Sequence, residues 1–314
     1  SRFSQRYGDN RGRSSELCYI GTCLTDEQGV SDMSMIESII LGLVQGLAEF
    51  LPISSSGHLA ALQHFFGISS DNVLTFTVML HFGTLIAIFV AYWKDIVDLV
   101  IELFATLKDL FTGKGLQMNK NETRRLGVMI IISTIPTAVI GLLFNDLFES
   151  LYSSMLFIGA ALLITGTCLW FAERKGGGKK GVKEMTMKDA LFIGVCQSIA
   201  ICPGISRSGA TMVGGLLSRF NRPHAVRYAF LISIPSVLGA FIMELPSAVD
   251  AASSQQCIGM GVMIAGIAVA AVSGYAAIKV MIKAVTNEKL FYFSIYTWIA
   301  GLFLIGYSIF AAMA

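Results

Sequence analysis

Two short segments combine serine, glycine and ionisable residues in a pattern that suits phosphate binding. The first, QGLAEFLPISSSGH, covers residues 45–58, and the second, PGISRSGAT, covers residues 203–211. In each segment a proline ends one helix and a Ser/Gly cluster begins the next. The start of a helix presents free backbone N–H groups and the positive end of the helix dipole, which together bind phosphate. The two segments therefore predict an anion site.

Ionisable residues lie in both segments although the surrounding sequence is apolar. Glu49 and His58 belong to the first segment and Arg207 to the second, and an ionisable residue in a membrane segment is a functional hypothesis by default. The planar guanidinium of Arg207 suits two phosphate oxygens at once. We expect the small residues beside these groups to bind phosphate as well: Ser54, Ser56, Gly57, Ser206, Ser208, Gly209 and Thr211. The alternatives are close helix packing for the small residues and a structural Glu49–Arg207 ion pair.

The same residues offer two routes for cleaving a phosphoric anhydride. A serine at 54–56 can attack phosphorus with His58 as general base and acid. Alternatively, Glu49 or a metal ion activates a water molecule. The sequence leaves both routes open. We favour Ser55 as the nucleophile because Arg207 occupies the equivalent position in the second segment.

A divalent cation can be held on the same helix face as Glu49. Gln45 precedes Glu49 by one helical turn, and together they are candidate ligands for Mg²⁺ or Ca²⁺ bound to a diphosphate, although Gln is a weaker ligand than a carboxylate. The other three histidines have no comparable context, and we expect them to pack or to lie at interfaces: His64, His81 and His224.

The composition places these segments in a membrane protein. Of 314 residues, 54% are hydrophobic and only 14% are charged, against roughly 25% charged in soluble domains. The net charge of +2 gives no reason to expect a nucleic-acid partner. A membrane helix needs about 20 apolar residues, and six stretches qualify: 74–93, 126–144, 155–172, 225–243, 259–278 and 290–313.

Basic residues in the loops indicate how the chain crosses the bilayer. Lysine and arginine gather in alternate loops, beginning with 94–125, which we therefore place in the cytoplasm together with an amphipathic helix. Basic and non-basic loops alternate between the two sides of the membrane only if segments 35–67 and 187–218 each enter and leave the membrane on the same side. We therefore expect both segments to be re-entrant hairpins. Residues 1–32 are polar and are expected to be a disordered or non-native tail, which leaves 33–314 as one membrane domain.

An internal repeat relates the two candidate segments. Residues 42–57 align without a gap on residues 194–209 at an offset of 152, with seven identities in sixteen positions. Chance similarity is the alternative. We expect repeat one at about 35–172 and repeat two at about 187–313, inverted relative to each other, with the site near the middle of the bilayer. The predicted fold is an all-α integral membrane protein with six transmembrane helices and two re-entrant helical hairpins in an inverted-topology repeat.

The two motifs closely resemble the signatures of the bacterial undecaprenyl-diphosphatase family of the bacitracin-resistance type. The resemblance covers about residues 35–313. It implies a multi-pass enzyme of the bacterial plasma membrane that hydrolyses undecaprenyl diphosphate to undecaprenyl phosphate, recycling the lipid carrier for peptidoglycan. It also implies a divalent cation, a site open toward the outer face, and a site made of Glu49, the serine cluster 54–56 with His58, and Ser206, Arg207 and Thr211. Among these we expect Glu49, Ser55, His58 and Arg207 to be catalytic. Gln45 stands where many members carry a second Glu, and the motif admits either residue.

Two functions from other classes compete with the phosphatase. Inverted repeats with broken helices also occur in transporters, so a transporter or flippase of a lipid phosphate or another anion is the main alternative. A non-catalytic membrane scaffold is the third, and it gives no reason for three ionisable groups in apolar segments. The bilayer and a polyprenyl diphosphate are the expected partners, with a homodimer as a further possibility.

Overall fold

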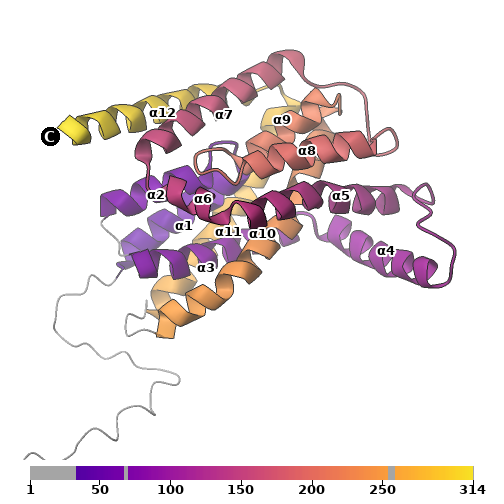
Figure 1. Ribbon diagram of the computed structural model, residues 1–314, viewed down its shortest axis with the longest axis horizontal. Helices are drawn as coiled ribbons and strands as arrows, with labels where there is room; N and C mark the ends of the chain where they lie inside the picture. Colours follow the sequence, from indigo (N-terminus) through magenta and orange to yellow (C-terminus); the bar gives the residue numbers. More distant parts are fainter. Residues whose placement is uncertain (1–32, 67–69, 254–258, 314) are drawn as a thin grey trace, which may run out of the picture. The chain divides into compact units, whose positions relative to one another are not determined.

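The chain folds entirely into helices over the residues that the structure describes. The structure is a computed structural model (Figure 1), and it describes residues 33–66, 70–253 and 259–313. The predicted tail at 1–32 lies outside these residues. Within them the chain forms twelve helices, and the sole β-bridge pairs Lys180 with Phe220.

The helices follow the chain in two sets that correspond to the two predicted repeats. The first set consists of α1 (Met35–Phe50), α2 (Ser55–Phe66), α3 (Ser70–Ala91), α4 (Trp93–Phe111), α5 (Glu122–Leu143), α6 (Asn145–Tyr152) and α7 (Met155–Lys175). The second set consists of α8 (Met187–Ile199), α9 (Arg207–Leu217), α10 (Arg222–Ser253), α11 (Met260–Thr286) and α12 (Leu290–Met313).

Five of the described helices are long and apolar enough to cross a membrane. They are α5, α7, residues Arg222–Met243 of α10, α11 and α12. A sixth candidate is α3 joined to α4, bent by 88° where the two helices meet. The prediction of an all-helical, multi-pass membrane protein is therefore confirmed. The predicted amphipathic helix of the 94–125 loop is α4.

The connection between α5 and α7 contains the short helix α6. This helix has eight residues, too few for apolar periodicity to be visible. Its side-chain hydrogen bond from Asn145 to Glu149, 2.8 Å long, joins positions four residues apart. Phe148 is buried, so packing rather than length stabilises the helix.

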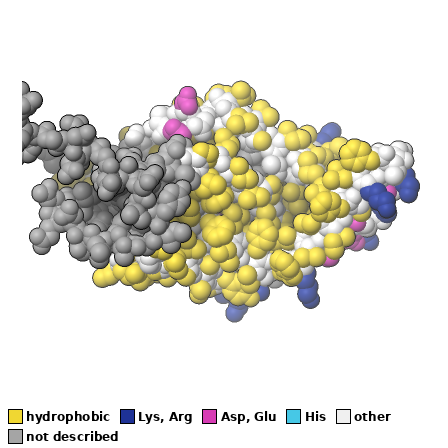
Figure 2. Space-filling view, turned by 90° about the horizontal axis from the view of Figure 1, so that it is seen from below, with side chains coloured by type: hydrophobic (Ala, Val, Ile, Leu, Met, Phe, Trp, Pro, Cys, Tyr) yellow, Lys and Arg dark blue, Asp and Glu magenta, His cyan; other side chains and the backbone are white. Residues whose placement is uncertain are grey.

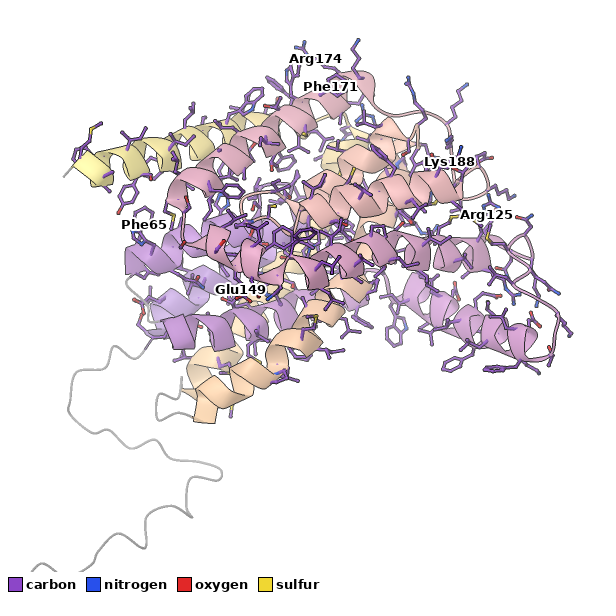
Figure 3. All side chains as sticks on the ribbon, in the orientation of Figure 1. Phe65, Arg125, Glu149, Phe171, Arg174 and Lys188 are labelled. Carbon is purple, nitrogen blue, oxygen red and sulfur yellow. The ribbon has the colours of Figure 1, made fainter. Side chains whose placement is uncertain are left out.

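The exposed surface agrees with a bilayer environment. Figure 2 shows hydrophobic side chains covering the middle of the described surface, with most of the Lys and Arg side chains toward one side. In Figure 3, Arg125 and Lys188 lie near each other, and Glu149 lies away from them. The Arg125 guanidinium donates to the carbonyl of Met185, 2.6 Å away, which ties two basic loops together. This grouping is the one that the positive-inside rule requires of loops on a common side.

The first helix of each set packs against a helix of the other set at a glycine. A Cβ on Gly42 of α1 would lie 2.5 Å from the carbonyl oxygen of Gly266 in α11. A Cβ on Gly194 of α8 would lie 2.3 Å from the carbonyl oxygen of Ser133 in α5. Gly42 and Gly194 are equivalent positions of the sequence repeat, so the two sets exchange the same helix contact.

Serine hydroxyls reinforce both of these helix pairs. Ser38 of α1 donates to the carbonyl oxygen of Val262 over 2.6 Å, and Ser133 of α5 donates to that of Ala190 over 2.8 Å. Ser38 and Ala190 are again separated by the repeat offset. Figure 1 also shows the last helices of the two sets, α7 and α12, lying side by side.

Matched capping boxes begin α1 and α8. Ser34 and Glu37 cap α1, and Thr186 and Asp189 cap α8, in each case with reciprocal side-chain and backbone hydrogen bonds. Such boxes satisfy backbone N–H groups that a helix start leaves unpaired. Because the caps occur at repeat-equivalent positions, they start both helices at the same distance from the Ser/Gly clusters.

The glycine contacts predict which substitutions the fold rejects. Gly42→Ala and Gly194→Ala each place a methyl group against a backbone carbonyl, so we expect each to cost about 1–3 kcal/mol of stability. Gly306→Ala is the matched control, because no atom lies within 4 Å of the added Cβ. The measurement is thermal unfolding in detergent. Equal melting temperatures for Gly42→Ala and Gly306→Ala would contradict the close approach of α1 and α11.

Asp189 predicts a pH dependence of stability at the start of α8. Burial raises the pKa of Asp189, but hydrogen bonds from Thr186 and Lys180 and the charge of Lys180 outweigh it, so the pKa lies below its ordinary value of 3.8. A carboxylate with a lowered folded-state pKa stabilises the protein above its unfolded-state pKa, and this contribution is lost as pH falls through the folded-state pKa.

We therefore expect Asp189→Asn to lower stability by about 0.5–1 kcal/mol near neutral pH, and this difference from wild type to vanish in acid. Unfolding in detergent at several pH values measures it. Asp98→Asn, on an exposed position of α4, is the control and should match wild type throughout. A difference that persists unchanged to the lowest pH would show that the charge of Asp189 has no part in it.

Candidate active site

The first Ser/Gly cluster forms a tight turn between α1 and α2. The chain leaves α1 at Leu51, and Ser54 caps α2 by accepting a hydrogen bond from the backbone N–H of Gly57 over 3.3 Å. Because Ser54 caps the helix, α2 begins at Ser55, within the Ser/Gly cluster. Ser54 has a φ of 70°, a left-handed conformation that non-glycine residues seldom adopt and that is concentrated at functional sites.

The second cluster caps a helix in the same way between α8 and α9, although Ser206 has an ordinary φ of −75°. Ser206 caps α9 by accepting a hydrogen bond from the N–H of Gly209 over 3.1 Å. The hydroxyls of Ser206 and Ser208 are 3.2 Å apart, close to the 3.3 Å between Ser54 and Ser56. Both clusters therefore present a capped helix start and a pair of hydroxyls.

The two turns pack against each other. A Cβ on Gly57 would lie 3.3 Å from the Cα of Gly204, and a Cβ on Gly209 would lie 3.2 Å from the Cβ of Pro52. The Ser208 hydroxyl donates to the carbonyl oxygen of Leu51 over 3.2 Å. Residues about 150 positions apart are thereby brought into one site, as the repeat predicted.

Glu49 lies at the centre of this site and is buried. Its Oε2 accepts hydrogen bonds from the Ser55 hydroxyl at 2.7 Å and from Gln45 Nε2 at 3.1 Å. Its Oε1 lies 3.6 Å from Nη1 of Arg207, which belongs to the other hairpin. On the Oε2 side, Nε2 of His81 lies 3.9 Å away. The carboxylate is therefore placed to accept the Ser55 proton while Arg207 holds its other oxygen.

His58 lies beside this group, but its ring is engaged elsewhere. Its Nδ1 lies 2.8 Å from the carbonyl oxygen of Ser54, and its Nε2 lies 2.7 Å from the hydroxyl of Tyr296 in α12. The two rings are stacked with an interplanar angle of 13°. Since both nitrogens already have partners, the group that contacts the Ser55 hydroxyl is the carboxylate of Glu49. An acid–base role for His58 stays a prediction.

A small pocket opens where Glu49 and Arg207 meet. Its polar lining consists of Glu49, Thr84, Arg207, Ser208 and Ser233, and its apolar lining of Phe50, Leu85, Ile88, Ala229, Phe230 and Val237. The predicted phosphate ligand Thr211 does not line this pocket, and its hydroxyl donates to the carbonyl oxygen of Arg207 over 2.9 Å. Phosphate binding by Thr211 and by the remaining predicted positions stays a prediction.

The oxygen atoms around Glu49 suit a hard divalent cation. Oε1 of Gln45 is buried without a hydrogen-bond partner, and an unpaired buried acceptor costs free energy that a bound cation would recover. Across the described residues, no three His, Cys, Asp or Glu side chains gather as a metal site. A cation here would therefore be held by Glu49 and Gln45 and by oxygens of its ligand, a donor set that Mg²⁺ and Ca²⁺ accept.

Two residues of the site were missed from the sequence. His81 was assigned to packing, yet it lies next to Glu49; the missed signal is that it is the sole ionisable residue in the apolar stretch 74–93. Tyr296 contacts His58 from α12. No pattern in the sequence distinguishes it from the other aromatic residues of that helix.

Comparison with known proteins identifies the family. Residues 38–303 match the family described as bacitracin resistance protein BacA. The chain belongs to the BacA family. The resemblance inferred from the two motifs is thereby confirmed.

Curated relatives in this family align over nearly their whole length. The undecaprenyl-diphosphatase of Alkaliphilus metalliredigens is 47% identical over 277 residues, which cover 88% of this chain and 100% of the relative. The undecaprenyl-diphosphatase of Carboxydothermus hydrogenoformans is 41% identical, over 86% of this chain and 95% of its own. That of Methanosphaera stadtmanae is 39% identical, over 86% and 96%.

Proposed function

We propose that this chain hydrolyses undecaprenyl diphosphate to undecaprenyl phosphate and inorganic phosphate, which returns the lipid carrier to cell-wall synthesis. The observation that carries the proposal is the 2.7 Å hydrogen bond from the Ser55 hydroxyl to Glu49, beside the Arg207 guanidinium. A nucleophile and a phosphate-binding cation thus both contact one buried carboxylate, which serves as the base. The names of the relatives supply the substrate.

Phosphate binding uses charge and backbone dipoles from both hairpins. Arg207 is half-buried and reaches Glu49 with one nitrogen, Nη1, which leaves the rest of its guanidinium for phosphate oxygens. The N-termini of α2 and α9 direct backbone N–H groups and their positive dipole ends toward the same region. These groups stabilise the negative charge of the diphosphate without reorganisation when the bond breaks.

The hydrogen bond from its hydroxyl to Glu49 favours Ser55 as the nucleophile. Glu49 accepts the Ser55 hydroxyl proton while Oγ attacks the terminal phosphorus. The bond from that phosphorus to the bridging oxygen breaks, and undecaprenyl phosphate leaves with the electron pair. Glu49 passes that proton to the leaving undecaprenyl phosphate and, ionised again, deprotonates the water that attacks the phosphoserine. The proton taken from water returns to Ser55 Oγ as inorganic phosphate is released. Direct attack by water, with Glu49 as base, gives the same products without a covalent intermediate.

A divalent cation, Mg²⁺ or Ca²⁺, held by Glu49 and Gln45 would neutralise charge on the diphosphate. Gln45 is fully buried one turn from Glu49, so the helix already fixes both side chains. His58 is held between Ser54 and Tyr296 at the start of α2. From there it keeps the Ser55 turn in place and offers a second titratable group near the phosphate.

The finer architecture also belongs to this proposal. We infer that α1–α2 and α8–α9 are re-entrant hairpins of an inverted-topology repeat in the plasma membrane, with the site open toward the outer face. The exchanged contacts at Gly42 and Gly194 and the mutual packing of the two turns support it. A two-fold exchange of equivalent contacts is what inverted repeats produce.

Phosphate release by purified protein tests the function. We expect release of inorganic phosphate from undecaprenyl diphosphate in detergent, and loss of release on chelation of divalent cations. Glu49→Gln and Arg207→Ala should each lower kcat/KM by about 10²-fold or more, as removal of a charge-stabilising group does. Glu149→Gln, on the exposed helix α6, is the matched control and should retain activity.

Undiminished release by both site variants would show that the pocket is not the active site. Absence of release from wild type, together with movement of the lipid across reconstituted vesicles, would favour a transporter instead.

Chemical trapping separates the two routes of hydrolysis. If Ser55 is the nucleophile, acid quenching of wild type during turnover should trap phosphoprotein, and Ser55→Ala should trap none. Ser56→Ala, whose serine is not hydrogen-bonded to Glu49, should still trap it. Mass spectrometry of the 45–58 segment locates the phosphate. Active wild type without any trapped phosphoprotein would indicate direct attack by water.

A further inference from the structure

We propose that His81 of α3 is a ligand of the divalent cation at Glu49, so that the site combines a carboxylate, an amide oxygen and an imidazole nitrogen. The inference rests on the proposed function for the cation itself, and it adds a residue that no motif of the chain contains. It also changes the chemical class of cation that the site should prefer.

The first observation is the position of the His81 ring relative to Glu49. Its Nε2 lies 3.9 Å from Glu49 Oε2, which is too long for a hydrogen bond. Two metal–ligand bonds of about 2.1 Å span up to roughly 4.2 Å, so one cation reaches both atoms. The side chain of His81 is 22% exposed, which leaves room for a ligand at this nitrogen.

The second observation is how the ring is oriented. Nδ1 of His81 lies 2.8 Å from the carbonyl oxygen of Thr77, one turn earlier in α3. A carbonyl accepts only a proton, so Nδ1 carries the hydrogen and the lone pair of neutral imidazole is on Nε2, toward Glu49. This backbone bond is the arrangement that fixes the tautomer of metal-binding histidines.

The third observation concerns the charges on the two oxygens of Glu49. Arg207 approaches Oε1, whereas His81 and Gln45 approach Oε2. A cation at Oε2 is therefore kept apart from the guanidinium by the width of the carboxylate. Repulsion between the two positive groups is reduced while both remain close to a diphosphate.

Gln45 is the third proposed ligand of the cation, beside Glu49 and His81. Its Nε2 donates to Glu49 Oε2, and its buried Oε1 has no partner. A half-turn of the amide exchanges the two atoms without a change in shape and directs the unpaired oxygen toward Oε2. A cation there would satisfy this acceptor of Gln45.

The consequence is a preference among cations. Imidazole suits transition-metal ions such as Zn²⁺, and Mn²⁺ is the transition-metal ion closest to Mg²⁺ in its preference for oxygen, whereas Ca²⁺ takes oxygen ligands alone. We therefore expect His81→Gln to weaken Mn²⁺ binding by about tenfold or more while changing Ca²⁺ binding by no more than about threefold. Titration of each metal alone into purified, tag-free protein, followed by calorimetry, measures both changes.

Pulsed electron paramagnetic resonance of bound Mn²⁺ gives a readout that does not involve catalysis. Wild type should show nitrogen modulation from a coordinated imidazole, and ¹⁵N-histidine labelling should change its frequency. His81→Gln should lose it, whereas His58→Gln and His64→Gln should keep it. These controls are well matched because the chain has only four histidines, the fourth being His224.

Each outcome separates the inference from the proposed function. Nitrogen modulation that survives in His81→Gln, or wild type that binds no Mn²⁺, overturns the assignment of His81 even if phosphate is released. Loss of modulation in His81→Gln supports the assignment even if wild type releases no phosphate. A folded His81→Gln, shown by wild-type gel filtration and circular dichroism, is required. The ¹⁵N labelling of wild type tests for a coordinated imidazole without any substitution, and absence of a frequency change would also overturn the assignment.

Discussion

The structure depends on how the chain satisfies its backbone at the two turns that separate α1 from α2 and α8 from α9. Hydrocarbon offers no hydrogen-bond partners, so a helix can stop inside a bilayer only where other protein groups replace water. In this chain the replacement is local, since Ser54 and Ser206 cap the helices that follow each break. The Ser208 hydroxyl donates to the carbonyl oxygen of Leu51 in the opposite turn, and the Thr165 hydroxyl of α7 bonds to the backbone of Gly204 and Ser206. Each break therefore depends on neighbouring protein groups, and the polar interior that results is where chemistry can occur.

This dependence of each turn on its neighbours explains why Glu49 and Arg207 come from different hairpins. Glu49 comes from α1, Arg207 from α9 and His81 from α3, and they meet around one carboxylate. A buried carboxylate without a partner would be too costly in free energy to keep ionised. Because the partner cation lies in the other repeat, neither half can hold a charged Glu49 alone. The divergence of the two copies is therefore what makes a single asymmetric site out of two similar turns.

Much of this could be predicted because it depends on local sequence and on the bilayer. The length of the apolar stretches predicted the membrane spans, and Pro52 with the serines after it predicted the first break. The offset of 152 between Ser54 and Ser206 predicted that two turns of the same kind would meet. What could not be predicted depends on long-range packing. Short α6 is stabilised by burial of Phe148, and Tyr296 reaches His58 from a helix whose aromatic residues look alike in sequence. His81 is different, since its polarity in an apolar stretch was visible but was interpreted as packing.

The exchanged packing of α1 and α8 has a consequence for how the protein is made. The α8 contact at Ser133 joins residues 57 positions apart, whereas the α1 contact at Val262 joins residues 224 positions apart. At roughly 5–20 residues per second of synthesis, about 10–45 s separate the emergence of the two partners of α1. During that interval α1 is without the helix that later covers its glycine face. The second copy has no such interval, because α5 precedes α8 in synthesis and is present when α8 emerges.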